Sequence, residues 1–344
     1  MSDMNQWPDE SVFEPFNISE ETYKIVDGHE IQAAILVPKS LKPGFAHPII
    51  INIHGGFLVT GHSLFPTFFA PWLADLAVAN SAIIVSADHR LLPTARGIID
   101  VVEDLEDFWQ WTHSSSGSGL SQALRRLVPG DDHSFDFSKL LLAGGSAGGY
   151  GASQLALSHP DDIAALALTY PFVDPQDPIF VDGPGPDEPT VLRFPPDQIL
   201  SREEAAAWIE ETRRAGVTTK AGAERTPFCV AATQHGIFYS MVIDNAKLMR
   251  PEFLPLERLR AGAKLPKNVW ILHGDQDSVV HIRTAQAFAG LIKERLSDTT
   301  VRFDVGKGED HGFDLCPPSW EAHAPGALDF VRDAWLNKRE KDGN

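Results

Sequence analysis

Short apolar runs recur along the chain, and most are followed by a stretch in which apolar residues have helical spacing. Runs bounded by turn residues are typical of strands buried on both faces, and their alternation with helices predicts a doubly wound, mostly parallel α/β sheet. Asp27-Gly28 separates the first two runs and predicts a hairpin, so the sheet is expected to begin antiparallel. The predicted strands are residues 23–26, 31–37, 48–53, 82–86, 140–143, 164–169, 269–272 and 301–305, and the clearest predicted helices are 67–79, 97–113, 148–158 and 284–296.

About 90 residues, 174–263, break this alternation. They lack a buried-strand pattern and are far more than a connection between elements needs. After a proline-rich opening, Ser201-Arg-Glu-Glu204 is a capping box that predicts the start of a helix, and a second helical pattern covers residues 236–248. We therefore predict an inserted, mainly helical cap over the carboxyl edge of the sheet, between two parts of one core, residues 1–173 and 264–344.

Composition narrows the function classes. The chain has 344 residues, of which 29 are basic and 47 acidic, and its formal net charge is −18. An acidic surface repels nucleic acid and anionic membranes, so neither is expected as a partner. Two distant cysteines, Cys229 and Cys316, favour a reducing compartment over a disulfide framework. Residues 1–20 contain no signal-peptide core and no apolar run is long enough for a membrane span, so we expect a cytoplasmic protein without stable membrane insertion.

The strongest chemical signal is a serine between glycines. The apolar run at 140–143 leads into Gly144-Gly-Ser-Ala-Gly148, and a small-residue helical pattern follows. This is the G-x-S-x-G nucleophile elbow in its strand–turn–helix context, where a sharp turn presents the serine hydroxyl and the glycines let strand and helix approach. We predict that Ser146 is the nucleophile of a serine hydrolase.

An earlier strand ends in His54-Gly-Gly-Phe57. The backbone N–H groups of such a loop, upstream of the elbow, can donate to the oxyanion of an acyl-transfer reaction. His54 is expected to orient this loop rather than to act as a base or metal ligand, because no residue with ligand spacing lies beside it.

The acid and the base should follow the serine in that order. The strand at 269–272 leads to a loop with two carboxylates, Asp275 and Asp277, and the next strand leads to a glycine-framed loop that presents His311. We predict that His311 accepts the serine proton, while a carboxylate of the preceding loop holds its ring and stabilises the imidazolium.

Other histidines near this loop offer an alternative chemistry. His273 is expected to make a buried structural hydrogen bond at its strand end. A metal site built from His273, Asp275, Asp277 and His281 is less favoured, because these side chains would not converge from a strand end and its loop.

Together, these motifs resemble the hormone-sensitive-lipase-like branch of the α/β-hydrolases, which includes many microbial carboxylesterases. His54-Gly-Gly resembles the oxyanion motif of that family, and Ala87-Asp-His-Arg-Leu-Leu-Pro93 resembles its Asp-Tyr-Arg-Leu-Ala-Pro stretch. The elbow matches as well. Asp277, within His-Gly-x-x-Asp-x-x-Val, stands at the acid position, and His311-Gly-Phe stands at the position of the base.

The resemblance implies an eight-stranded sheet, a cap to which residues 1–22 contribute, and no cofactor or metal. The implied oxyanion donors are the backbone N–H groups of Gly56, Phe57 and Ala147, and the implied support of their loop comes from His54 and Gly55. Phe57 stands where the family usually has a third glycine. Its side chain is therefore expected to narrow the acyl site.

We predict a serine esterase that cleaves a small to medium, largely apolar carboxylic ester through an acyl-enzyme. The same triad would also suit a lactonase, an arylformamidase-like amidase or a hydrolase of a biosynthetic intermediate, and these alternatives stay open. A homodimer is also possible. The alternative outside enzymes is a ligand-binding receptor on the same fold. Because receptors similar to this family have lost the catalytic histidine, the presence of His311 weighs against it.

Specificity is expected to reside in the predicted cap. In open α/β sheets, ligands bind at the carboxyl ends of the strands. The cap holds more apolar residues than a connector needs, and some of them are expected to roof the pocket. These residues are Phe194, Trp208, Ile209, Phe228, Ile237, Phe238 and Met241.

Overall fold

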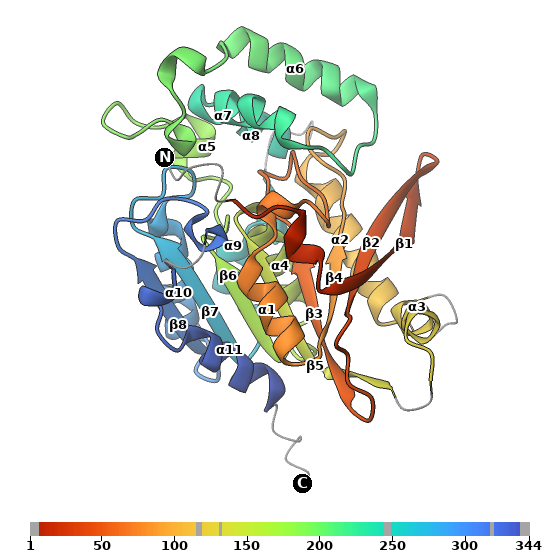
Figure 1. The fold of residues 1–344 in the computed structure, drawn as a ribbon. Coiled ribbons are helices and arrows are strands. Elements are labelled where there is room, and N and C mark those ends of the chain that lie inside the picture. Colours follow the sequence, from red (N-terminus) through yellow and green to blue (C-terminus); the bar gives the residue numbers. More distant parts are fainter. Residues whose placement is uncertain (1–6, 115–118, 131–132, 244–248, 317–319, 338–344) are drawn as a thin grey trace.

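The computed structural model describes residues 7–114, 119–130, 133–243, 249–316 and 320–337. Within these ranges the chain forms one eight-stranded sheet in the order β1-β2-β4-β3-β5-β6-β7-β8 (Figure 1). β2 pairs antiparallel with β1 and β4, and all other neighbours are parallel. The strands are β1 (Phe16–Val26), β2 (His29–Pro38), β3 (Ala46–Ile53), β4 (Ile83–Ala87), β5 (Ser134–Gly145), β6 (Ala165–Thr169), β7 (Asn268–Gly274) and β8 (Thr300–Gly306).

The predicted mostly parallel α/β fold with an antiparallel start is confirmed. Each predicted apolar run overlaps an observed strand, because a run buried on both faces leaves a continuous apolar signature. β1 is the main difference, since it begins at Phe16 and not at residue 23. It is an edge strand with mostly exposed or half-buried side chains, so its first residues carry no apolar run.

The extent of β1 also corrects one expectation about the cap. Residues 16–22 were expected to contribute to the cap, but they pair with β2 from Phe16↔Pro38 to Thr22↔Gln32. They belong to the sheet because backbone pairing satisfies their N–H and C=O groups there. Glu20 of this strand does reach the inserted segment, where its carboxylate pairs with Lys220.

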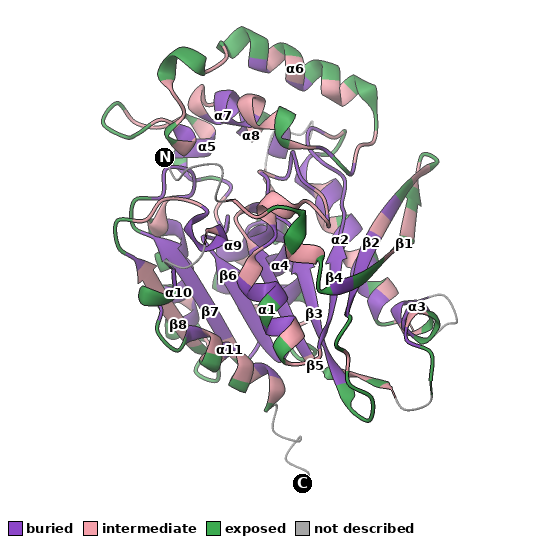
Figure 2. Cartoon of the chain, viewed as in Figure 1, coloured by how far each residue is buried: buried purple, intermediate pink, exposed green. Residues whose placement is uncertain are grey.

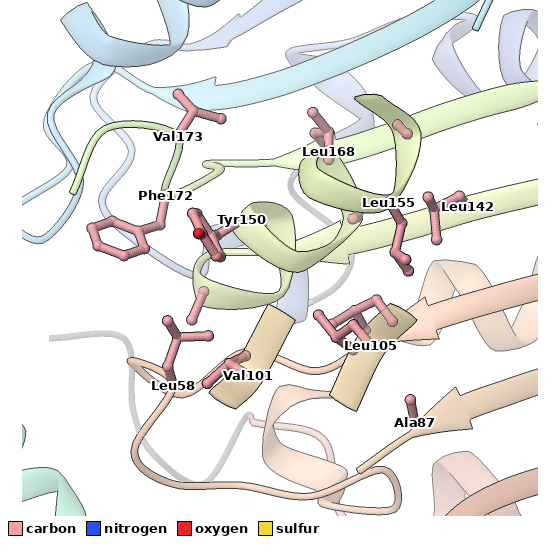
Figure 3. Close-up of a cluster of buried hydrophobic side chains, with 14 of the residues drawn as sticks. Leu58, Ala87, Val101, Leu105, Leu142, Tyr150, Leu155, Leu168, Phe172 and Val173 are labelled. Carbon is pink, nitrogen blue, oxygen red and sulfur yellow. The ribbon is translucent and has the colours of Figure 1, made fainter. Parts of the chain in front are cut away.

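Helices cover both faces of the sheet, and alternate strand residues point to each face. In β3, Ile49 and Ile51 join one buried cluster and Ile50 the other. The first cluster includes α2 and α4; Figure 3 shows Leu105 and Tyr150 from these helices in it. The second includes α1 and α11. The helices of the core are α1 (Pro71–Ala79), α2 (Ile98–Thr112), α3 (Leu120–Leu127), α4 (Ala147–Ser158), α10 (Ile282–Arg295) and α11 (Ala327–Leu336).

The segment between β6 and β7 contains five α-helices in its described part, and α6 and α7 lie beyond the strand ends, away from the sheet (Figure 1). Figure 2 shows that α6 is largely exposed along its outer side. The predicted capping box is present, because Ser201 and Glu204 bond each other's backbone N–H at the start of α6. These helices are α5 (Pro178–Val181), α6 (Arg202–Ala215), α7 (Thr226–Gln234), α8 (Tyr239–Val242) and α9 (Pro255–Arg260).

Two details of this segment differ from the sequence pattern. α7 was not predicted: its residues from Cys229 to Thr233 are all buried, so it lacks the polar face that makes a helical period visible. The helix predicted over 236–248 corresponds to the short α8, and residues 244–248 lie outside the described ranges. Within the described ranges, no helix combines the length and apolarity needed to cross a membrane.

Candidate active site

Ser146 lies in the tight turn between β5 and α4. Its φ of 54° is in the left-handed region, which is uncommon for a residue with a side chain. Its N–H donates to Thr169 O at 2.9 Å and its C=O accepts from Gly149 and Phe172, so both sides of the turn are bound. A Cβ on Gly148 would lie 2.0 Å from Ile53 O, so only glycine lets α4 approach β3 this closely.

The structure brings the predicted serine, histidine and aspartate together. His311 Nε2 lies 2.9 Å from Ser146 Oγ, and His311 Nδ1 lies 2.8 Å from Asp277 Oδ2. Asp277 Oδ1 accepts from the backbone N–H of Val279 and Val280, which orients the carboxylate. Asp275 is exposed and accepts from Gly308 N instead, so of the two candidate carboxylates only Asp277 meets the histidine.

Asp277 and His311 each stabilise the charged form of the other. Burial alone would raise the pKa of Asp277, but the charges and hydrogen bonds of His311 and His273 outweigh it and hold that pKa below its usual range. Burial alone would lower the pKa of His311, but the Asp277 carboxylate outweighs it and raises that pKa. The arrangement therefore favours an ionised acid that stabilises the histidine as a cation.

His273 makes the buried hydrogen bond expected of it, because its Nε2 lies 2.8 Å from Val280 O. The same nitrogen lies 3.2 Å from Asp277 Oδ2, so His273 also contacts the acid. The side chains considered as a metal set do not converge, since His281 pairs with Asp177 and Asp275 bonds Gly308.

The loop after β3 lies directly against the elbow. A Cβ on Gly55 would be 3.7 Å from Ser146 Cβ. Gly56 has a φ of 109° and leaves no room for a side chain, because a Cβ would lie 2.2 Å from Thr60 O. Phe57 follows with a φ of 58°. Among the described contacts, no main-chain or side-chain acceptor takes the N–H of Gly56, Phe57 or Ala147.

His54 is buried beneath this loop. Its Nδ1 donates to Gly55 O at 2.7 Å, and its ring stacks on His89 with 4.6 Å between the ring centroids. Burial lowers the pKa of His54 well below its ordinary value, and the neighbouring His89 acts in the same direction. A neutral His54 within the loop is consistent with the predicted orienting role.

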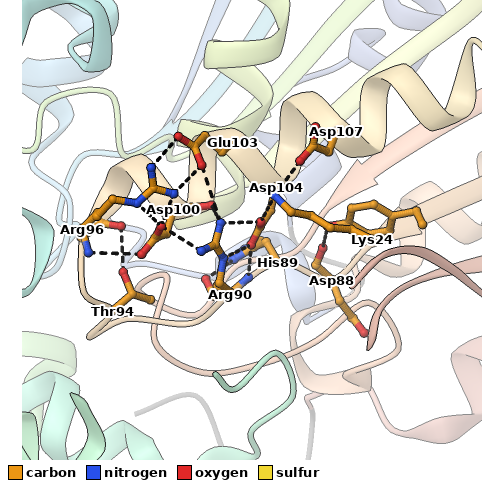
Figure 4. A network of polar contacts seen from close by, with 12 residues as sticks. Lys24, Asp88, His89, Arg90, Thr94, Arg96, Asp100, Glu103, Asp104 and Asp107 are labelled. Carbon is orange, nitrogen blue, oxygen red and sulfur yellow. Dashed lines mark hydrogen bonds and ion pairs between the residues drawn. The ribbon is translucent and has the colours of Figure 1, made fainter. Parts of the chain in front are cut away.

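A largely buried ion network joins the segment after β4 to α2 (Figure 4). The Arg90 guanidinium pairs with Asp100 and Asp104, each from α2. Two residues further on, Leu92 N donates to Leu58 O at 2.7 Å. The network and this hydrogen bond therefore connect α2 to the loop after β3.

A small, largely apolar pocket, partly open to solvent, is lined by Ser146. Phe57 and Phe172 come from the core, whereas Phe180 and Phe238 come from the inserted segment, residues 174–263. The Phe180 and Phe238 rings contact each other with centroids 5.4 Å apart. Of the seven residues expected to supply the roof, Phe238 lines this pocket, whereas Phe180 was not among them.

Further residues around His311 were not predicted. The Tyr170 ring lies 4.5 Å from the His311 ring, between centroids, and its hydroxyl donates to the buried carboxylate of Asp314. Trp72 Nε1 donates to the other oxygen of Asp314 at 2.8 Å. Burial raises the pKa of Asp314. The position of Asp314 next to the His-Gly-Phe motif was the available signal, but its partners come from distant parts of the chain.

Comparison with known protein families decides the classification. The family described as "alpha/beta hydrolase fold" matches residues 50–315. The chain belongs to this family. Within it, the chain is 27% identical over 338 residues to the probable carboxylesterase M8 of a Phoma species, with 96% of this chain and 99% of that protein covered. It is 30% identical over 208 residues to the probable carboxylesterase clz11 of Cochliobolus lunatus, with 58% of this chain and 87% of that protein covered. The resemblance to hormone-sensitive-lipase-like carboxylesterases is thereby confirmed.

Three further similarities extend the comparison. The chain is 25% identical over 345 residues to the non-reducing polyketide synthase stbA of Stachybotrys bisbyi, with 92% of this chain but 15% of that protein covered. The esterase of Pyrobaculum calidifontis has a TM-score of 0.57 at 19% identity, with 95% of this chain and 87% of that chain covered. Esterase LipW of Mycobacterium marinum has a TM-score of 0.58 at 18% identity, with 95% and 83% covered. At these identities the solved structures support the fold.

Proposed function

We propose that this chain is a carboxylic ester hydrolase in which Ser146 is the nucleophile, His311 the general base and Asp277 the orienting acid. One observation carries the proposal, namely the continuous hydrogen-bonded path from Asp277 through His311 to Ser146 Oγ beside an apolar pocket. Such a path lets the hydroxyl lose its proton as it attacks, which an isolated serine cannot do at neutral pH.

The reaction proceeds in two halves. Ser146 Oγ attacks the ester carbonyl while His311 Nε2 takes its proton, and the carbonyl oxygen becomes an oxyanion between the N–H groups of Gly56, Phe57 and Ala147. His311 then gives the proton to the leaving alcohol as the C–O bond breaks. In the second half, the same nitrogen takes a proton from water as the water attacks the acyl carbonyl. His311 then returns this proton to Ser146 Oγ as the ester bond to the serine breaks, which releases the acid.

The pocket favours compact, apolar substrates. Phenylalanine rings and the side chains of Ala147, Val279 and Val280 line the space next to Ser146, and none of these groups can pair with a charge. A small to medium ester with an apolar acyl or alkoxy group fits this chemistry. A lactone or a formamide reacts through the same steps, so both stay alternatives for the bond that is cleaved.

One observation favours a second candidate among the biosynthetic hydrolases. Nearly the whole chain is similar to a segment of a protein named as a non-reducing polyketide synthase. A serine hydrolase of this kind could act on a polyketide intermediate, because Ser146 attacks an acyl ester or thioester in the same way. Comparing short alkyl esters with aromatic polyketide-like thioesters as substrates distinguishes the two candidates.

The decisive experiment combines labelling with turnover. Incubation with a fluorophosphonate should modify Ser146 in the purified protein, and p-nitrophenyl acetate should be hydrolysed with or without a chelator. Ser146→Ala should abolish both labelling and rapid turnover. A folded wild-type protein that is neither labelled nor active would favour the receptor alternative. The cytoplasmic location and the homodimer stay predictions.

A further inference from the structure

Asp310 connects the two loops that carry the acid and the base. Its Oδ1 accepts from Ser278 N at 2.8 Å and from Ser278 Oγ at 2.9 Å. The same oxygen accepts from the backbone N–H of His311 at 2.8 Å. One carboxylate oxygen therefore binds the residue that follows Asp277 and the backbone of the base itself.

The other oxygen of Asp310 binds an arginine from the inserted segment. Arg193 Nε donates to Asp310 Oδ2 at 2.6 Å, and Arg193 Nη2 donates to Gln276 O at 3.2 Å. Gln276 directly precedes Asp277. A single guanidinium thus contacts both loops, next to the acid on one side and next to the base on the other.

The backbone around Arg193 is held in an unusual conformation. Leu192 and Arg193 have φ values of 55° and 49°, a region that residues with side chains adopt at a cost. Val191 is fully buried, and its N–H donates to Gln234 of α7 at 3.1 Å. Thr190 Oγ1 bonds Phe194 O across the turn. Such strain persists only where surrounding contacts impose it, and here those contacts lie within the inserted segment.

Phe238, which lines the pocket, belongs to the same packed unit. Its backbone N–H donates to Ala232 O of α7, the helix that holds Val191 through Gln234. A displacement of this unit, such as one that admits substrate, would therefore move the Arg193 guanidinium away from Asp310 and Gln276. A continuous set of hydrogen bonds thus joins the wall of the pocket to the two loops.

We propose that Arg193 is a positioning residue that couples the seating of the inserted segment to the alignment of Asp277 and His311. The hydroxyl of Ser146 is then fully activated only when the pocket wall is in place. This inference rests on the proposed function, because alignment matters only if Ser146, His311 and Asp277 catalyse the reaction.

The test is Arg193→Met, with Arg213→Met as the matched control. Arg213 also belongs to the inserted segment and also contacts one carboxylate, Glu210, and one backbone carbonyl, Ser240 O, but both partners lie in the same segment. We expect Arg193→Met to lower kcat roughly tenfold or more with a smaller change in KM, since small misplacements of catalytic groups are costly. Arg213→Met should leave kcat within about twofold of wild type.

The pH profile separates positioning from a general loss of stability. The charged groups that face His311 are Asp277, Asp310 and Asp314, and the charge of each raises the pKa of His311. Without the Arg193 cation, the negative charge of Asp310 is no longer offset, so it should raise the pKa of His311 further. The acid midpoint of kcat/KM should therefore move up by a few tenths of a pH unit. Asp310→Asn should move it down. Arg193→Lys keeps the positive charge but cannot contact Asp310 and Gln276 together as the guanidinium does. It should therefore keep the acid midpoint of kcat/KM and still lower kcat.

The outcomes are distinguishable. Equal kcat and equal midpoints for Arg193→Met and Arg213→Met, in folded proteins with similar melting temperatures, would overturn the coupling. Opposite midpoint shifts for Arg193→Met and Asp310→Asn, with kcat lost only in the Arg193 and Asp310 variants, would establish it. Failure of wild-type protein to react with fluorophosphonate would instead overturn the proposed function itself.

Discussion

Two regions line the pocket beside Ser146, and they reach it in different ways. The loops after β3 and β5 are neighbours because the strands pair in register, with Ile53 opposite Gly144. The backbones next to them pack so closely that a Cβ on Gly148 would lie 2.0 Å from Ile53 O. The inserted segment instead reaches the pocket through the rings of Phe180 and Phe238. Backbone pairing suits groups that must stay in place, whereas side-chain packing suits a wall that can vary with the substrate.

The largest expected effect comes from the backbone-held region. Ser146→Ala removes the nucleophile without changing the turn, so kcat should fall by about three orders of magnitude or more, as in other triads. Steady-state kinetics and circular dichroism on the same preparation test this. Wild-type-like turnover by a folded Ser146→Ala protein would show that the elbow is not the reacting site.

A similarly large effect should distinguish the two carboxylates. Asp277→Asn deprives His311 of its acceptor and should lower kcat by roughly three to four orders of magnitude. Asp275→Asn changes an exposed group whose carboxylate accepts from Gly308 N and makes no hydrogen bond with His311 in the described part of the chain, and kcat should stay within about threefold of wild type. If both variants lost activity equally, the assignment of the acid would be wrong.

The side-chain-packed region should affect selectivity more than rate. Phe238→Leu reshapes the pocket wall on the side of the inserted segment, and Phe57→Gly removes a ring that lines the pocket from the core side. Each should change the ratio of kcat/KM between short and long acyl esters by about tenfold, the scale of one or two methylenes in an apolar pocket. Labelling of Ser146 should persist in both variants.

Phe228→Leu is the control for this prediction, because Phe228 stacks on Trp208 within the inserted segment and does not line the pocket. For Phe228→Leu, the ratio of kcat/KM between short and long acyl esters should match that of the wild type. A shift in that ratio as large as that of Phe238→Leu would mean that selectivity depends on the general packing of the segment and not on contact with substrate.

The smallest expected effect is a pH shift. His311 must be neutral to accept the serine proton, and its pKa is raised by Asp277. Activity should therefore be present above this raised pKa and be lost as the pH falls through it, with a midpoint above the ordinary histidine value of about 6.5. A rate that is flat across this range, where chemistry limits turnover, would contradict a histidine base.

Local patterns made much of the core predictable. Strands buried on both faces leave continuous apolar runs, so short stretches of chain predicted the parallel sheet. The residues of the nucleophile elbow are adjacent in sequence, so the position of Ser146 was predictable as well. The acid-bearing loop and His311 could be chosen because each follows a strand whose carboxyl end lies at the same edge of the sheet. The choice of Asp277 over Asp275 came from the resemblance to the family motif. The roles of Asp277 and His311 in catalysis stay predictions until the variants are measured.

Long-range contacts account for what could not be predicted. The seven N-terminal residues of β1 look like a polar loop until β2 pairs with them, and α7 shows no helical period because it is buried on every side. Nothing near Arg193 in the chain points to Asp310, 117 positions away. Periodicity records which residues are buried but not their partners, so the contact between the inserted segment and the catalytic loops arises only when the chain is folded.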